Sequence, residues 1–108
     1  MASPNIKLEI LLPLNYNDKT RVEEHKFVAT YDELIEKFNG VTVDRTPLLG
    51  GWVDPATERR YEDETIVYWI VCKSTAQNLN FIKSLKPKLE KRFRQNEILM
   101  YYILVYTI

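Results

Sequence analysis

The segment TYDELIEKFNG, residues 30–40, carries the clearest structural signal in this chain. Its first four residues have the form of a capping box, in which Thr30 is the N-cap and the Glu33 side chain reaches back to it. Apolar residues then follow at helical spacing, at Tyr31, Leu34, Ile35 and Phe38. Asn39-Gly40 predicts the end of the helix, with Gly40 in the left-handed backbone conformation. The segment therefore predicts an amphipathic helix.

Segments typical of β-strands lie on both sides of this helix. Residues 6–14 alternate apolar and other side chains, and residues 65–72 and 98–107 are rich in β-branched and aromatic residues. Residues 41–43 predict a short strand that ends before Pro47. Residues 52–61 flank a turn at 54–57 and predict an extra hairpin. The charged residues 19–29 fit a separate short helix.

A second helix is predicted after residue 73. Ser74 begins a second capping box, which ends at Gln77. The apolar residues that follow at spacings of three and four are Leu79, Ile82, Leu85, Leu89 and Phe93. Because Pro87 lies off this stripe, we expect one kinked helix rather than two elements.

The order of these elements predicts an α+β fold in a single domain, residues 1–108. Two βαβ halves of this kind form a ferredoxin-like βαββαβ sandwich, with an antiparallel sheet and two helices on one face. Right-handed crossovers place the first and third strands in the centre of that sheet. The extra hairpin at about 52–61 would be an addition to the ferredoxin-like order.

Composition excludes several classes of protein. The chain has 108 residues, 15 basic and 15 acidic side chains, one Cys and one His. One cysteine excludes an internal disulfide framework, and one Cys with one His excludes a zinc site built from those ligands. The longest uncharged apolar stretch, residues 98–108, is too short to span a membrane. We expect a cytoplasmic protein with no membrane segment, no cofactor and no metal.

The second face of the predicted sheet is unusually apolar for a surface in contact with water. We take Trp69, Tyr68, Tyr101, Lys7 and Glu9 as its candidate binding surface. A second copy, another protein, a small apolar ligand, or residues 19–29 or 44–60 of this chain would cover it. Because two-fold dimers are the commonest oligomers, the sequence favours a homodimeric binding or regulatory module.

Charge is concentrated in one segment of the chain. Residues 73–94 hold seven Lys and Arg against one Glu, a net charge of +6. The candidate basic patch contains Lys83, Lys86, Lys91, Arg92 and Arg94. A solvated helix face explains it most simply, and nucleic-acid binding is the alternative. In a metal-dependent nuclease of this kind, Asp63 or Glu62 would hold the metal.

A small-molecule enzyme with its pocket at the sheet face is a further alternative. It would use Tyr68, Trp69, Tyr101 or His25, although no assignment of catalytic residues follows from the sequence. His25 lies among charged residues and fits a solvated surface better than a catalytic site. Cys72 ends an apolar strand and fits a buried small side chain.

The chain resembles a group of small bacterial domains of unknown function. The resemblance rests on an F-x-G-x-T turn at 38–42, a G-x-W element ending at Trp52, and an acidic pair within 61–64 before the third strand. It implies a ferredoxin-like fold and no established activity. We predict that Trp52 is a core residue, and a wall on which a ligand stacks is the alternative.

Overall fold

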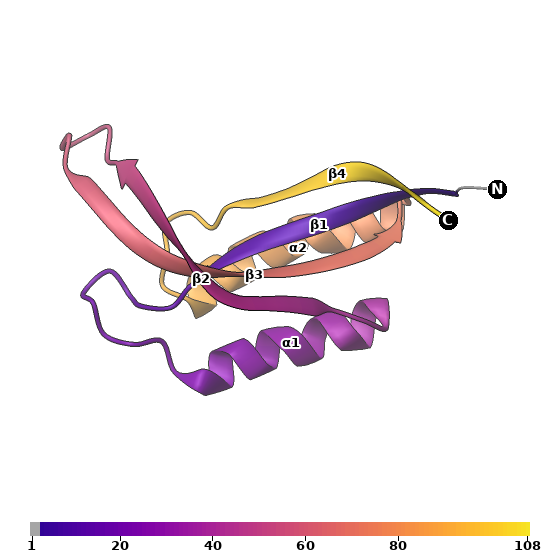
Figure 1. Ribbon diagram of the computed structural model, residues 1–108, viewed down its shortest axis with the longest axis horizontal. Coiled ribbons are helices and arrows are strands. Elements are labelled where there is room, and N and C mark those ends of the chain that lie inside the picture. Colours follow the sequence, from indigo (N-terminus) through magenta and orange to yellow (C-terminus); the bar gives the residue numbers. More distant parts are fainter. Residues whose placement is uncertain (1–2) are drawn as a thin grey trace.

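The computed structural model describes residues 3–108 and shows four strands and two helices (Figure 1). Along the chain these are β1 (Ser3–Pro13), α1 (Glu24–Phe38), β2 (Thr42–Val53), β3 (Arg60–Lys73), α2 (Ala76–Arg92) and β4 (Met100–Thr107). The predicted α+β class is confirmed, and the element order is consistent with a ferredoxin-like βαββαβ sandwich.

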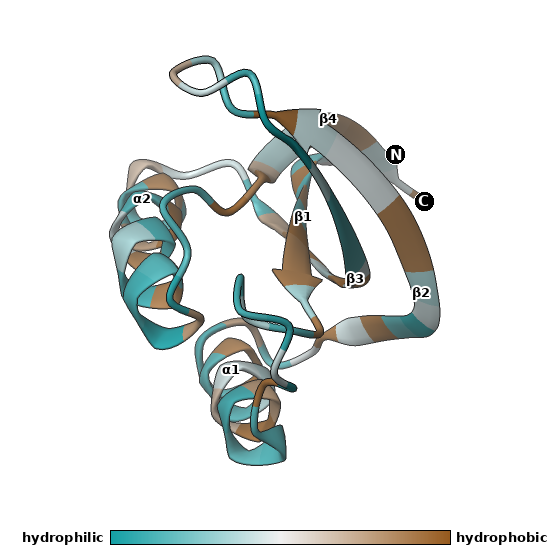
Figure 2. Ribbon diagram, turned by 90° about the vertical axis from the view of Figure 1, so that its left-hand side faces the viewer, coloured by the Kyte–Doolittle hydropathy of each residue, from teal (hydrophilic) through white to brown (hydrophobic). Residues whose placement is uncertain are grey.

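The four strands form one antiparallel sheet in the order β2-β3-β1-β4. The central strand β1 pairs with β3 on one side and with β4 on the other, so that Leu8 lies opposite both Ile70 and Tyr102. Both helices lie on the same side of the sheet (Figure 2). We call the opposite side the open face.

The core lies between the sheet and the helices. It contains Ile6, Leu8, Ile10 and Leu12 of β1, Ile66, Tyr68 and Ile70 of β3, Phe27 and Leu34 of α1, and Ile82, Leu85 and Leu89 of α2, with Phe93 and Ile98 beyond α2. Within residues 3–108, no helix is long and apolar enough to cross a membrane.

Helix α1 differs from its prediction at both ends. It begins at Glu24, so Thr30 is an interior residue whose hydroxyl donates to the Lys26 carbonyl at 2.8 Å rather than an N-cap. The predicted separate helix at 19–29 is wrong: residues 24–29 form the first turns of α1, and residues 19–23 belong to the loop before it. At the other end Asn39 takes the left-handed conformation, with φ of 62°, and no glycine has a positive φ. Asparagine tolerates this region because its short side chain bonds locally.

Helix α2 follows its prediction closely. It is one helix that passes through Pro87, and the apolar stripe from Ile82 to Leu89 is buried. The cap differs: Thr75, and not Ser74, is the N-cap, because its hydroxyl accepts a hydrogen bond from the Asn78 amide at 3.1 Å.

The segment 42–65 forms one long hairpin rather than a short strand followed by an extra hairpin. Strand β2 continues through Pro47, with a register shift between Asp44 and Leu48, and the turn after Val53 joins it directly to β3. Proline is tolerated because β2 is an edge strand, whose outer amides need no partner. We call residues 48–65 the hairpin arm; it extends past the helices at one end of the molecule (Figure 1).

Candidate functional site

The open face brings together four of the five residues predicted as a binding surface. Glu9 lies opposite Trp69 on β3 and opposite Tyr101 on β4. The Lys7 ammonium lies 4.5 Å from the Trp69 ring centroid and 3.9 Å from the Glu9 carboxylate. The neighbouring Glu9 carboxylate raises the pKa of the Tyr101 hydroxyl. Polar and aromatic groups therefore alternate across the middle of this face.

Tyr68 is not part of this surface, and its assignment there is wrong. Its side chain is 4% exposed and lies on the helix side, where its hydroxyl donates to the Phe27 carbonyl at 3.3 Å. Burial raises the pKa of this hydroxyl to about 12. Because consecutive residues of a strand point to opposite faces, Tyr68 and Trp69 cannot share a surface.

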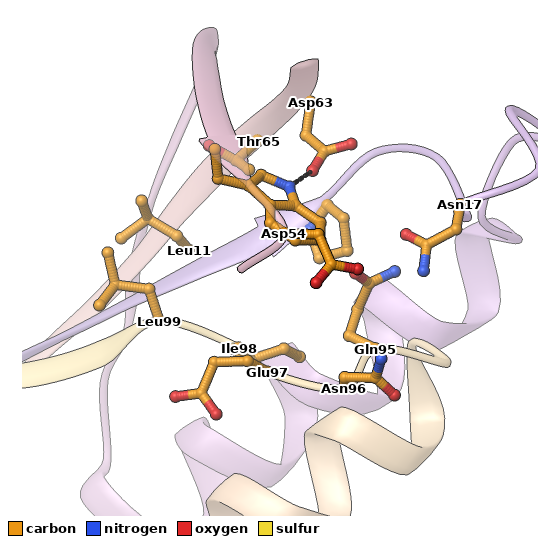
Figure 3. Close-up of a pocket in the computed structure, with 12 residues that line it drawn as sticks. Leu11, Asn17, Asp54, Asp63, Thr65, Gln95, Asn96, Glu97, Ile98 and Leu99 are labelled. Carbon is orange, nitrogen blue, oxygen red and sulfur yellow. Dashed lines mark hydrogen bonds between the residues drawn. The ribbon is translucent and has the colours of Figure 1, made fainter. Parts of the chain in front are cut away.

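A pocket of about 460 Å³ lies at one end of the open face, between the hairpin arm and the segment that leads into β4 (Figure 3). It is lined by Leu11, Pro13, Asn17, Trp52, Asp54, Asp63, Thr65, Gln95, Asn96, Glu97, Ile98 and Leu99. This volume is within the range of small-molecule sites. Strand β1 supplies one wall, the hairpin arm another, and the α2–β4 connection the third.

An ordered aromatic side chain forms the arm side of the pocket. Trp52 is 45% exposed, which contradicts its prediction as a core residue. Its ring stacks on Tyr61 with centroids 4.6 Å apart, and its indole Nε1 donates to Asp63 Oδ2 at 2.9 Å (Figure 3). Opposite, Leu11 and Leu99 contribute apolar surface. The pocket therefore combines an aromatic plate with aliphatic walls.

The charged side chains that line the pocket are all acidic. They are Asp54, Asp63 and Glu97, and amide side chains at Asn17, Gln95 and Asn96 complete the polar set. Asp63 is bonded to Trp52, and Glu97 pairs with Lys86 outside the pocket at 2.8 Å. Among the described residues no group of three or more His, Cys, Asp and Glu is arranged to hold a metal. The pocket suits an organic cation that carries a flat ring.

The basic segment 83–94 is largely engaged in holding the fold together. Lys86 donates to the Glu97 carboxylate at 2.8 Å and to the Ile98 carbonyl at 2.6 Å. Arg92 lies 3.4 Å from the Glu33 carboxylate of α1. The Arg94 guanidinium lies over a tyrosine ring in the β1–α1 loop. Lys83 and Lys91 take part in no ion pair within residues 3–108, and nucleic-acid binding stays a prediction.

Neither His25 nor Cys72 lines the pocket. His25 is an exposed residue in the first turn of α1, on the other side of the sheet. Cys72 is half-buried on β3, and burial raises the pKa of its thiol. A raised pKa leaves less of the reactive thiolate at neutral pH. These two residues have no part in the candidate site.

Sequence reasoning missed most of the residues that form this pocket. Trp52 and Tyr61 flank the predicted turn at 54–57, and they pair across the two strands. This predicted pairing of two aromatic residues was the available signal for the arm side of the pocket. Residues 95–99 carry no motif, and they approach the hairpin arm only through the tertiary fold.

Comparison with known proteins shows a likeness of fold rather than of sequence. No family model matches the sequence, and no curated protein matches it. The solved structure of a phage SAM lyase in complex with S-methyl-5'-thioadenosine superposes with a TM-score of 0.69. The match covers 95% of this chain and 88% of that chain at 10% sequence identity. At this identity the likeness shows a shared fold.

Proposed function

We propose that this chain binds S-adenosylmethionine in the pocket beside Trp52 and cleaves it as a lyase. The observation that carries the proposal is a pocket whose charged groups are all carboxylates and whose wall is an aromatic ring. S-adenosylmethionine offers a sulfonium cation and a purine. A phage SAM lyase that shares the fold over nearly the whole chain supports the choice of ligand.

The composition of the pocket fits the charge changes of such a cleavage. The bond between sulfur and the γ-carbon of the methionine part breaks, and its electron pair stays on sulfur to leave S-methyl-5'-thioadenosine. The four-carbon remainder either closes onto its own carboxylate oxygen as a lactone or loses a β-proton to a base. Asp54 takes part in no ion pair within residues 3–108; its Oδ1 accepts the Ala56 amide at 2.8 Å, which leaves Oδ2 to take that proton. Neither route consumes water or a cofactor.

Apolar walls favour this reaction over binding alone. In the lactone route a sulfonium cation and a carboxylate anion disappear together, so the transition state carries less charge than the substrate. Surroundings of low polarity therefore destabilise the substrate more than the transition state. Leu11 and Leu99 provide such surroundings next to the acidic rim.

The test incubates the purified chain with S-adenosylmethionine and quantifies S-methyl-5'-thioadenosine by chromatography, with binding followed by calorimetry. We expect product formation and a loss of at least tenfold in Leu99→Asp, because a charge then stands in the apolar wall. Asp32→Asn, on the exposed side of α1, is the matched control and should behave as the unchanged chain. Absence of both binding and product in the unchanged chain would overturn the proposal.

A second proposal concerns the apolar surface itself: two copies of this chain associate through β4. This edge strand is exposed on both faces, at Tyr101 (42%), Tyr102 (50%), Ile103 (47%), Leu104 (59%) and Tyr106 (63%). Tyr101 and Ile103 lie on the open face, and Tyr102, Leu104 and Tyr106 lie on the helix side, so a second copy that pairs along the β4 edge would contact both sets. A binding or regulatory module would use the same surface.

Light scattering behind a sizing column tests this second proposal. We expect about twice 12.8 kDa for the unchanged chain and 12.8 kDa for Ile103→Lys. Val28→Lys replaces an equally exposed apolar residue on α1 and should leave the dimer intact. A concentration-independent monomer of the unchanged chain would refute self-association without touching the lyase proposal.

A further inference from the structure

We propose that Trp52 is the stacking plate for the purine ring of the ligand and that Asp63 is the positioning residue that holds it. This inference rests on the proposed function, since it names the part of S-adenosylmethionine that the hairpin arm recognises. It assigns the specificity of the pocket to the arm rather than to the sheet.

The geometry of the arm leaves one face of Trp52 for a ligand. The Arg59 guanidinium carbon lies 5.3 Å from the Tyr61 ring centroid, and Tyr61 in turn stacks on Trp52 at 4.6 Å with an angle of 18° between the rings. Trp52 lines the pocket and Tyr61 does not. The indole is therefore the last layer of an ordered stack that ends at the pocket. A purine is the natural next layer, because every nucleobase has a π-face that stacks on an aromatic ring.

Asp63 gives this plate a defined orientation. Its Oδ2 accepts the Trp52 Nε1–H at 2.9 Å, and the two residues lie on paired strands of the arm. A tryptophan that is 45% exposed would otherwise sample several rotamers. The hydrogen bond and the stack together fix the indole before the ligand arrives, which lowers the entropy cost of binding.

The α2–β4 connection, on the other side of the pocket, supplies Gln95, whose side-chain amide would hydrogen-bond to the edge of the purine ring. Gln95 donates its Nε2–H to the Phe93 carbonyl at 3.2 Å, so Oε1 is the end of the amide that remains for a ligand. A carbonyl oxygen accepts from the exocyclic amine of adenine and is repelled by the oxygen of a 6-oxopurine. The pocket should therefore prefer adenosine to inosine.

The test uses adenosine as the probe and follows binding by calorimetry and by tryptophan fluorescence. Trp69→Phe leaves Trp52 as the only tryptophan, and we expect adenosine to quench its emission. Trp52→Ala should weaken adenosine binding by about 5–150-fold, which corresponds to the ~1–3 kcal/mol of one base–aromatic stack. Tyr31→Ala, which removes an aromatic side chain of similar exposure (42%) on α1 outside the pocket, should leave the affinity unchanged.

Two variants of Asp63 test whether this residue positions the Trp52 ring or only stabilises the fold. Asp63→Asn keeps an acceptor oxygen for the indole and should retain adenosine affinity, whereas Asp63→Ala should lose several-fold and broaden the emission of Trp52. Unchanged adenosine affinity in Trp52→Ala, with binding intact in the parent, overturns this inference alone. No binding of adenosine or S-adenosylmethionine by the parent chain overturns the proposed function as well.

Discussion

The Arg92 guanidinium of α2 donates a hydrogen bond of 2.8 Å to the Thr30 hydroxyl of α1. Thr30 is fully buried and donates its own hydrogen to the Lys26 carbonyl at 2.8 Å. One hydroxyl group thus accepts from one helix and donates within the other. Because Arg92 also lies 3.4 Å from Glu33, the contact is part of a small charged network that joins the two helices across the back of the sheet.

Removal of the Thr30 hydroxyl should destabilise the fold. In Thr30→Val the shape is kept but Arg92 loses the shorter of its two hydrogen-bonding partners, so we expect a loss of about 1–3 kcal/mol in the free energy of unfolding. Urea denaturation measures it. Ser84→Ala removes an exposed hydroxyl that bonds only within α2, and it should change stability by less than ~0.5 kcal/mol. Equal effects of the two substitutions would contradict the assigned role.

Glu23 should make the stability depend on pH in acid. The hydrogen bond that its carboxylate accepts from the Tyr16 hydroxyl, with the nearby Lys26 charge, lowers the pKa of Glu23 to about 2 from 4.5. Because the folded state binds this proton less tightly than the unfolded state, the contribution is present above pH 4.5. It is lost as the pH falls from about 4.5 towards 2.

Denaturation of the parent chain and Glu23→Gln between pH 2 and pH 6 tests this dependence. The stability difference between the two should shrink as the pH falls. Glu24→Gln, one position further on, has no such partner in the described chain and is the matched control. A difference that stays constant over this range would refute the linkage.

Phe27 and Phe93 should be energetically coupled. Their rings meet edge to face with centroids 5.3 Å apart, and both are buried where α1 faces the end of α2. A double-mutant cycle with Phe27→Leu and Phe93→Leu should give a coupling of about 0.5–1.5 kcal/mol. The pair Phe27 and Ile82 has no ring contact, and the corresponding cycle with Ile82→Val should give less. Additive effects in the first cycle would exclude an aromatic contribution.

Cys72 should react slowly with alkylating reagents. Burial raises the pKa of its thiol, so a smaller fraction is thiolate at pH 8 than in an unfolded chain. Iodoacetamide labelling followed by mass spectrometry should be several-fold slower for the native protein than for the urea-unfolded protein. Equal rates would show that the thiol is open to solvent.

The sequence predicted the fold correctly in segments where apolar residues keep one helical or strand spacing throughout. The stripe of α2 and the alternation of β1 each require one face to be buried, and both are buried as their spacing indicates. The start of α1 was predicted wrongly because threonine is a common N-cap residue. In the structure the Thr30 hydroxyl instead bonds to Lys26 within the helix and to Arg92 of α2. Local sequence cannot distinguish the two, since Arg92 lies far along the chain.

The candidate site depended on contacts between distant segments. Trp52 and Asp63 meet across a hairpin whose turn the sequence predicted, but the sequence did not show that β2 continues past Pro47 and makes this hairpin long. Residues 95–99 carry no motif of their own and join the pocket because Lys86 holds Glu97 and the Ile98 carbonyl against α2.

By itself the sequence determined the α+β class, the element order and the excess of apolar surface on β3 and β4, because periodicity and composition are local properties. The tertiary structure alone decided which of those apolar residues are exposed and that Tyr68 belongs to the core. It also decided that the charged groups of the pocket are all carboxylates. The physical reason is that burial and electrostatic environment arise from packing between segments far apart in the chain.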